Sequence, residues 1–225
     1  MILTIADILV KQKLASINLE LDDLVWRDGR VTAGAVAKKV KRNEQADLST
    51  GKGKKLAATL LDCISSHPVL AAAARPRKIS NLMISKTANG GHYGPHVDNA
   101  LMIQSDKSLR TDLSFTLFLS SPDNYEGGEL TIHAAGVTQS IKGDAGDLIL
   151  YPSSSIHEVS PVTAGERIVC VGWIESLIAD PTQRELLFDL ENLRVSLRGQ
   201  LSTQSAELVT LDKVIANLIR QWAVT

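Results

Sequence analysis

The sequence predicts an α+β fold in which a double-stranded β-helix, or jelly roll, carries helical flanks at both ends. Helical periodicity dominates residues 1–76 and returns in residues 178–225. Between them, residues 77–177 contain about eight short apolar or alternating runs separated by turn residues. Many short strands in so few residues are typical of a sandwich or jelly roll and not of a parallel α/β sheet. We therefore expect an N-terminal helical flank, a jelly-roll domain and a C-terminal helical segment with these bounds.

The N-terminal flank is expected to be mostly helical. Leu56 and Ile64 belong to a helical repeat that follows Thr50, a residue that can cap such a helix. Residues 26–30 have the composition of a turn. The basic run 38–42 is expected to be the solvated face of a helix.

Strands in the central domain are expected between clusters of Gly, Pro, Asn and Asp. They span residues 79–86, 93–99, 111–119, 128–133, 136–141, 147–151, 156–161 and 166–174. The pair Gly127 and Gly128 is expected to serve a tight turn or a β-bulge. His133 follows a strand end and is expected at the surface.

Residues 178–225 are expected to form two amphipathic helices. Pro181 suits a first helical turn, and leucines between positions 186 and 197 recur at helical spacing. A second apolar stripe runs from Leu208 to Trp222. We expect these apolar faces to pack on the remaining chain. The alternative is a homo-oligomer that forms through the helical flanks.

Composition and charge exclude several classes of partner. The net charge of the 225 residues is −1, so we expect no nucleic-acid partner and no acidic membrane partner. No apolar run reaches the roughly 18 residues of a membrane span. The apolar start, residues 1–10, has no basic residue ahead of Asp7 and is not expected to be a signal peptide. Cys63 and Cys170 fit no metal-binding spacing, so we expect free thiols in a reducing cytoplasm.

Two histidines and one aspartate have the pattern of a metal-binding triad. His96 and Asp98 lie two residues apart at the end of an expected strand, so both side chains point to the same side. His157 lies in a later strand that a jelly roll can place beside the first. Two imidazoles and one carboxylate cap one face of an iron ion and leave the opposite face open, as in non-haem Fe(II) oxygenases.

Zinc held by the same three ligands is the competing interpretation. A zinc hydrolase needs a general base near the metal, and the sequence contains no H-E-x-x-H motif. Glu158 follows His157 directly, so in a strand the two side chains point to opposite faces. The sequence therefore favours iron over zinc.

Arg167 supplies a cation near this triad, ten residues after His157. A turn at residues 163–165 lets the two residues lie on neighbouring antiparallel strands and face the same interior. The planar guanidinium grips a carboxylate with two parallel hydrogen bonds. The combination suggests chemistry that uses iron, a 2-oxo acid and O₂.

Longer segments carry a resemblance to a known family. The matching segments are YGPHVDNA (93–100), RTDLS (110–114), YEGGEL (125–130), LYPSSSIH (150–157), GER (165–167), WRDGR (26–30), NEQ (43–45) and LFDL (187–190). By these motifs the chain resembles the Fe(II)/2-oxoglutarate-dependent dioxygenase superfamily in its prolyl-4-hydroxylase-like branch. It looks most like the bacterial PKHD-type hydroxylases, which are associated with iron uptake.

The resemblance implies a metal centre, a reaction and cofactors. Fe(II) would be bound by the catalytic residues His96, Asp98 and His157. The co-substrate 2-oxoglutarate would chelate the iron, and Arg167 would pair with its distal carboxylate. The enzyme would hydroxylate an unactivated C–H bond with O₂ while ascorbate keeps the iron ferrous.

One departure from the family pattern concerns the co-substrate site. Relatives commonly carry Asn-Arg-Tyr where this chain has Ser85-Lys86-Thr87. We expect Thr87, or Tyr93 in its place, to make the co-substrate contacts beyond Arg167.

The substrate, a small molecule or a peptide, cannot be named from the sequence. Asn99, His92 and Trp26 are candidates for contact with it, whereas Tyr151 and Trp173 are expected mainly in the core. An alternative function is an iron- or 2-oxoglutarate-responsive binding protein with little turnover. A cupin-like metal hydrolase or isomerase is disfavoured, because neither reaction needs a dicarboxylate clamp.

Overall fold

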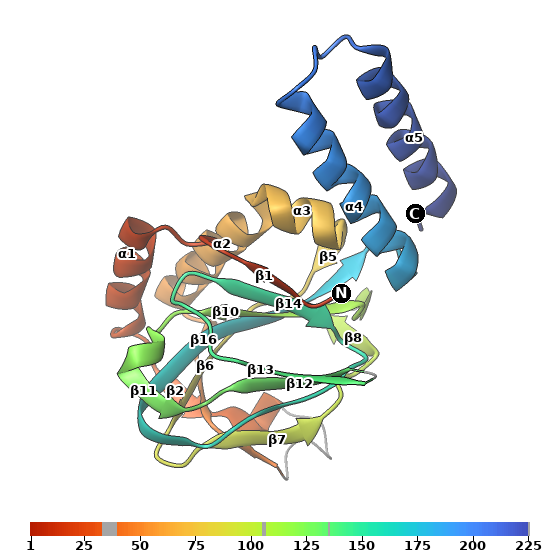
Figure 1. Ribbon diagram of the computed structural model, residues 1–225. Helices are drawn as coiled ribbons and strands as arrows, with labels where there is room; N and C mark the ends of the chain where they lie inside the picture. Colours follow the sequence, from red (N-terminus) through yellow and green to blue (C-terminus); the bar gives the residue numbers. More distant parts are fainter. Residues whose placement is uncertain (33–39, 105–106, 135, 225) are drawn as a thin grey trace.

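Two facing β-sheets form the body of the protein. The computed structural model describes residues 1–32, 40–104, 107–134 and 136–224. Three helices from the N-terminal part cover the larger sheet, and a pair of C-terminal helices projects from one end (Figure 1). Every described strand pair is antiparallel. This is the jelly-roll core with helical flanks that the sequence predicts.

Among the described residues, the larger sheet has nine strands. Seven follow the order β1-β14-β10-β16-β6-β4-β2, and β11 and β5 also pair with β16. Their bounds are β1 Leu3–Ile5, β2 Trp26–Asp28, β4 Glu44–Ala46, β5 Pro76–Ile79, β6 Met83–Ala88, β10 Leu113–Phe118, β11 Tyr125–Gly127, β14 Leu148–Pro152 and β16 Val162–Ser176.

The smaller sheet has five strands in the order β13-β12-β15-β7-β3, and a separate hairpin pairs β8 with β9. Their bounds are β3 Lys41–Arg42, β7 His92–His96, β8 Leu101–Gln104, β9 Lys107–Arg110, β12 Leu130–Ala134, β13 Val137–Ile141 and β15 Ile156–Val159. Strands β7 and β15 are neighbours although about 60 residues separate them in the chain.

Alternation along the strands divides the core into two layers. In β14, Leu148 and Leu150 belong to the layer beneath the helices, whereas Ile149 and Tyr151 belong to a second cluster with Phe118. Successive strand residues point to opposite faces, so one strand supplies both layers. The second cluster lies between the sheets, where the cavity described below opens.

Helices close the outer face of the larger sheet and extend the fold at its C-terminus. Thr50 caps α2 as expected, with its hydroxyl accepting a 3.1 Å hydrogen bond from Gly53 N, and Pro181 begins α4. The helices are α1 Lys11–Leu21, α2 Gly51–Ser66, α3 Pro68–Ala74, α4 Pro181–Arg198 and α5 Ala206–Trp222, with short 3₁₀ turns η1 Gly29–Thr32 and η3 Pro122–Asn124.

Helices α4 and α5 pack against each other, through Leu187 and Ile215 among others. Within the described chain, no single helix has the length and apolarity needed to cross a membrane. The bent pair α2 and α3 meets that test only when its two helices are taken together, by length and composition alone.

The sequence missed several short strands. In the N-terminal flank, β1 pairs with β14, β3 with β7, and β2 with β4, which in turn pairs with β6. Strands of two or three residues are too short to display a period, so their pairing partners define them. The three-residue strand β11 was missed for the same reason. The hairpin of β8 and β9 was also missed, and the expected strand 79–86 is interrupted at residues 80–82.

The basic run 38–42 was interpreted wrongly as a solvated helix face. Residues 38 and 39 lie outside the described residues, but Lys41 and Arg42 form β3 at the edge of the smaller sheet. The Lys41 side chain is directed inward, and the residue is only 7% exposed. Charge alone does not place a lysine at the surface when its strand partner faces a cavity.

Candidate active site

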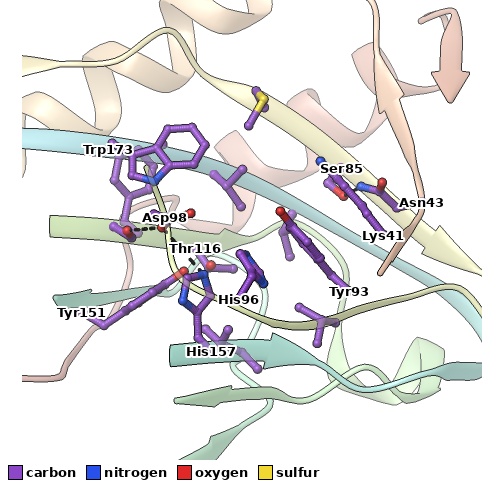
Figure 2. A pocket seen from close by; sticks show the side chains of 18 of the residues that line it. Lys41, Asn43, Ser85, Tyr93, His96, Asp98, Thr116, Tyr151, His157 and Trp173 are labelled. Atoms are coloured by element: carbon purple, nitrogen blue, oxygen red, sulfur yellow. Dashed lines mark hydrogen bonds and ion pairs between the residues drawn. The ribbon is translucent and has the colours of Figure 1, made fainter. Parts of the chain in front are cut away.

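Strand pairing brings three potential metal ligands together between the sheets. His96 at the end of β7 lies directly opposite His157 in β15, and Asp98 follows two residues after His96. One ligand atom from each of the three lies within 4.8 Å of the others. Figure 2 shows the three side chains converging on one side of the pocket.

Both imidazoles are held with the same ring nitrogen turned away from this centre. His96 Nδ1 lies 2.8 Å from the Gly94 carbonyl oxygen, and His157 Nδ1 lies 3.1 Å from that of Ser155. A carbonyl only accepts, so each Nδ1 carries the proton and donates it. The lone pair of each Nε2 is therefore free for a metal ion, and the hydrogen bonds orient the rings.

The Asp98 carboxylate is oriented in a similar way. Ser114 Oγ donates a 2.6 Å hydrogen bond to Asp98 Oδ2, and Ser153 Oγ lies 2.7 Å from Ser114 Oγ. Both serines are buried. The hydrogen bond fixes the orientation of the carboxylate, and Oδ2 also lies 3.7 Å from His157 Nε2.

Burial keeps His96 neutral. Desolvation, followed by the neighbouring His157, lowers the pKa of His96 to about 4. The two rings lie 4.2 Å apart between centroids, so protonation of both would be strongly unfavourable. A neutral imidazole is the form that binds a metal ion.

This donor set fits ferrous iron. Two neutral nitrogens and one carboxylate oxygen make a facial triad with open positions opposite. The acid next to His157 does not enter the site, because Glu158 contacts His133 Nε2 at 3.3 Å on the other face of the strand. The general base that a zinc hydrolase would need is thus not supplied by Glu158. His133 itself lies within β12 and is partly exposed, not beyond the strand end as expected.

Arg167 is a buried cation that lines the same cavity. It is 2% exposed, and within the described chain its Nε and Nη2 have no hydrogen-bond partner. Burial lowers its pKa from the usual 12.5, and its guanidinium lies 5.4 Å from the Phe118 ring centroid. A buried guanidinium with unused donors is costly unless an anion pairs with it. Its surroundings therefore favour a bound carboxylate.

The lack of a side chain at Gly128 leaves space for the Arg167 side chain. Gly128 has φ +71°, and a Cβ at this position would lie 2.8 Å from Arg167 Cδ. Gly127 belongs to a register shift between β11 and β16. The expected bulge at Gly127 and Gly128 therefore shapes the cation site.

The two other expected co-substrate residues also line the cavity. Thr87 in β6 is paired with Arg167 in β16, so both side chains lie on the same face of the larger sheet. Tyr93 stacks on His96 with ring centroids 3.6 Å apart, and burial raises its pKa to about 12. Thr87 is thus adjacent to the cation, whereas Tyr93 lies beside the metal ligands.

The three candidate substrate residues have different locations. Asn99 is exposed at the rim of the cavity. His92 lines a separate hollow beside β3, on the face opposite Tyr93. Trp26 lies outside the cavity lining, with Lys86 Nζ 4.6 Å above its ring. The structure brings only Asn99 to the site.

The sequence did not single out several cavity residues. Tyr151 and Trp173 are buried or half-buried, as expected, but both also line the cavity. Of the lining residues, Lys41 and Ser114 were not identified as site residues, nor was Ser153, which contacts Ser114. The cavity holds about 980 Å³ of empty space, part of it open to solvent. The pairing of β3 with β7 is the feature that would have located Lys41.

Lys41 is the second cation of the lining. Its Nζ lies 5.1 Å from the centroid of the Tyr93 ring, and burial lowers its pKa to about 8. Figure 2 shows Tyr93 between His96 and Lys41. The side chain thus reaches the cavity from the wall away from Asp98 and Trp173.

Comparisons with known proteins agree with this geometry. A family model described as the 2OG-Fe(II) oxygenase superfamily matches residues 82–175, and a PKHD-type hydroxylase C-terminal domain matches residues 182–223. A PKHD-type hydroxylase of Hyphomonas neptunium is 49% identical over 98% of this chain and 99% of its own length. Another from Acidovorax ebreus is 43% identical over 99% of both.

Solved structures share the fold at low sequence identity. A prolyl hydroxylase from Trichoplax adhaerens, in complex with a peptide fragment of hypoxia inducible factor, has a TM-score of 0.59 at 16% identity, over 77% of this chain and 83% of its own. A Pseudomonas putida prolyl-4-hydroxylase has a TM-score of 0.52 at 20% identity, over 78% and 92%. These likenesses support the jelly-roll core.

Proposed function

The chain belongs to the PKHD-type hydroxylases of the 2OG-Fe(II) oxygenase superfamily, and we propose that His96, Asp98 and His157 bind its ferrous iron while Arg167 binds 2-oxoglutarate. The enzyme is an iron- and 2-oxoglutarate-dependent hydroxylase. The finer proposal is that it hydroxylates an unactivated C–H bond of a small molecule or peptide. The observation that carries it is a facial triad and, in the same cavity, a buried guanidinium of which Nε and Nη2 have no partner among the described residues.

Each residue has a distinct part in this proposal. The two Nδ1–H groups and Ser114 orient the three ligands before metal arrives, which limits the reorganisation that binding requires. Arg167 pairs with the distal carboxylate of 2-oxoglutarate, and Thr87 lies beside it. Bound iron with 2-oxoglutarate supplies the oxygen-activating chemistry.

The cavity walls serve to exclude water. Apolar side chains from both sheets line it: Leu130, Val159, Val169 and Val171. Tyr93 covers one face of His96, and Tyr151 approaches His157 edge-on at 5.0 Å. A dry site strengthens electrostatic contacts to bound carboxylates and protects reactive species from side reactions.

Anaerobic titration and turnover test this proposal. The purified protein should bind one Fe(II) and then 2-oxoglutarate, and under O₂ it should convert 2-oxoglutarate to succinate. His96→Ala or Asp98→Ala should abolish both iron binding and succinate formation. His133→Ala, on the outer face, is the matched control and should leave both intact. Succinate formation that survives in the His96 variant refutes the assignment, and iron binding without succinate would favour a binding protein.

Two accessory features belong to the same proposal. Ascorbate is proposed to restore Fe(II) after uncoupled turnover, so its omission should shorten the linear phase of succinate formation. We also propose a link to iron uptake, which family resemblance and an iron-binding donor set support. Deletion of the gene should then change growth of the host on iron-limited medium.

The proposal also covers the oligomeric state and the cellular location of the protein. Leu186, Leu193 and Val195 on α4 and Val209 and Val214 on α5 are exposed apolar side chains. We propose that this helical pair contacts a second copy, which light scattering on the purified protein tests directly. Both cysteines are free thiols, which supports a reducing cytoplasmic setting.

A further inference from the structure

Lys41 is a buried ammonium group with no assigned partner. It is 7% exposed, and no described residue gives its Nζ a hydrogen bond or an ion pair; the described contact is with the Tyr93 ring. The acids that affect it electrostatically are Asp98 and Asp28. Ser114 already bonds the first, and Arg30 pairs with the second at 2.9 Å. These two acids offset the cost of burying the cation only in part, because desolvation outweighs their attraction.

The charges that line the cavity do not balance. Among the described residues, the lining contains two cations, Lys41 and Arg167, and one carboxylate, Asp98. Under the proposed function, Fe(II) adds two positive charges and 2-oxoglutarate adds two negative ones. The positive charges of iron and Arg167 are then equal in number to the negative charges of Asp98 and the co-substrate, and the imidazole ligands are neutral. The ammonium of Lys41 is left as one unmatched positive charge.

Most of the buried polar atoms that lack a partner among the described residues of the cavity lining are donors; the exception is the acceptor Asn43 Oδ1. Besides Arg167, the buried indole Nε1 of Trp173 has no partner within the described chain. Figure 2 shows Trp173 and Lys41 on opposite sides of the metal ligands. Donors and cations around a centre select a ligand rich in acceptors and negative charge.

We propose that Lys41 binds a carboxylate of the primary substrate, so that the substrate class is an acid and not a neutral molecule. This inference rests on the proposed function and goes beyond it by assigning a substrate group. A free amino-acid derivative and a peptide with an acidic side chain or a free C-terminus both offer that carboxylate. Tyr93 separates the ammonium from His96, so the carboxylate lies away from the iron and the rest of the substrate extends towards it.

Matched acids and amides test the proposal without knowledge of the natural substrate. The protein is loaded with Zn(II), which supports no turnover, and saturated with 2-oxoglutarate so that Arg167 is occupied. The probes are N-acetyl derivatives of the twenty amino acids as free acids and as C-terminal amides, and amidated pentapeptides with glutamate or glutamine at the centre. Ligand-observed NMR and calorimetry report binding.

Free acids, or the glutamate peptides, should bind at least about tenfold more tightly than the matched neutral probes, as expected for a charge-assisted hydrogen bond. Lys41→Met should remove that preference, and Lys41→Arg should keep part of it. Arg42→Met is the control: Arg42 is the neighbouring residue of β3 and lies on the opposite face. Binding of the free N-acetyl amino acids would indicate a small acid as substrate, whereas binding of the glutamate pentapeptides would indicate an acidic peptide.

Three outcomes overturn the inference: acids and amides that bind equally, a preference that survives in Lys41→Met, and no binding by any acid. Weaker 2-oxoglutarate binding in Lys41→Met would also overturn it, because Lys41 would then hold the co-substrate. If the unmodified protein binds neither Fe(II) nor 2-oxoglutarate, the proposed function fails instead. The two failures are therefore distinguishable.

Discussion

The Ser114 hydroxyl donates a 2.6 Å hydrogen bond to Oδ2 of Asp98, and Ser153 lies 2.7 Å behind it. The hydrogen bond between Ser114 and Asp98 joins β10 to the segment that follows β7. Since Oδ2 is held in this way, the carboxylate cannot rotate freely and stays close to the two histidines, with Oδ2 3.7 Å from His157 Nε2.

Ser114→Ala should weaken Fe(II) binding about tenfold, because groups that orient metal ligands commonly contribute at that level. The fold should tolerate the change. Anaerobic titration of Fe(II) measures the effect. Ser140→Ala, on β13, is the control and should leave iron affinity unaltered. Equal Fe(II) affinities in the two variants would show that Ser114 does not contribute to metal binding.

Arg167→Met should reduce the affinity for 2-oxoglutarate by about 100-fold, since it deletes a charge-assisted bidentate contact from a buried residue. Iron binding should persist, because the triad is separate. Arg167→Lys should retain only part of the affinity, because an ammonium group lacks the planar fork. Calorimetric titration of 2-oxoglutarate into the metal-loaded protein checks this, and an unchanged affinity in the Met variant would contradict it.

Gly128→Ala should raise the KM for 2-oxoglutarate through displacement of Arg167. Its Cβ would lie 2.8 Å from Arg167 Cδ, and its φ of +71° adds backbone strain. Gly136→Ala supplies a matched control with φ +80° and no atom within 4 Å of the new Cβ. Both variants should lose about 1 kcal/mol of stability from strain, but only the first should alter KM.

Lys41→Met should stabilise the protein without ligand by about 1–3 kcal/mol, since it removes an unpaired buried charge. The pKa of Lys41 falls from 10.5 to about 8 on folding, so folding releases protons between these values. The charged Lys41 therefore lowers the free energy of unfolding by its full amount below pH 8, and this loss of stability disappears as the pH rises towards 10.5. Denaturant unfolding across this range should show the gain of the variant shrinking with pH, and a gain that is constant in pH would contradict the assignment.

The two thiols should react at very different rates. Cys170 is fully buried in the core, and burial raises its pKa to about 12, so almost no thiolate forms at neutral pH. Cys63 is partly exposed. A thiol reagent should label one cysteine in the native protein and two after unfolding. Cys63→Ser should abolish the native labelling; rapid labelling that remains would place Cys170 at an opening.

The sequence predicted the jelly-roll core and the convergence of the three metal ligands. His96, Asp98 and His157 were identifiable because their spacing places them on strands that a jelly roll makes adjacent, and only a few ligand patterns suit iron. Their role as ligands stays a prediction until metal binding is measured. Arg167 was identifiable because a short turn separates it from His157.

The sequence did not predict the wall formed by β3 and β4. Lys41 belongs to a run of basic residues, which usually indicates a solvated surface. Its location depends on pairing between β3 and β7, across about 50 residues of chain, and two-residue strands carry no period of their own. His92 lies outside the cavity lining for a related reason, because proximity to a motif in sequence does not determine which face of a strand a side chain occupies. Trp26 also lies outside the lining, although its segment was expected to shape the entrance.

The pairing of β3 with β7 and of β4 with β6 has a consequence for how this protein can diverge. Positions 41, 43 and 45 line the cavity, yet they are encoded far from the residues that converge on the metal. Substitutions in this short stretch can alter which molecules fit while the oxidative machinery stays untouched. Specificity and reactivity can therefore evolve separately within one chain, and exchange of residues 41–46 between homologues is a direct route to new preferences.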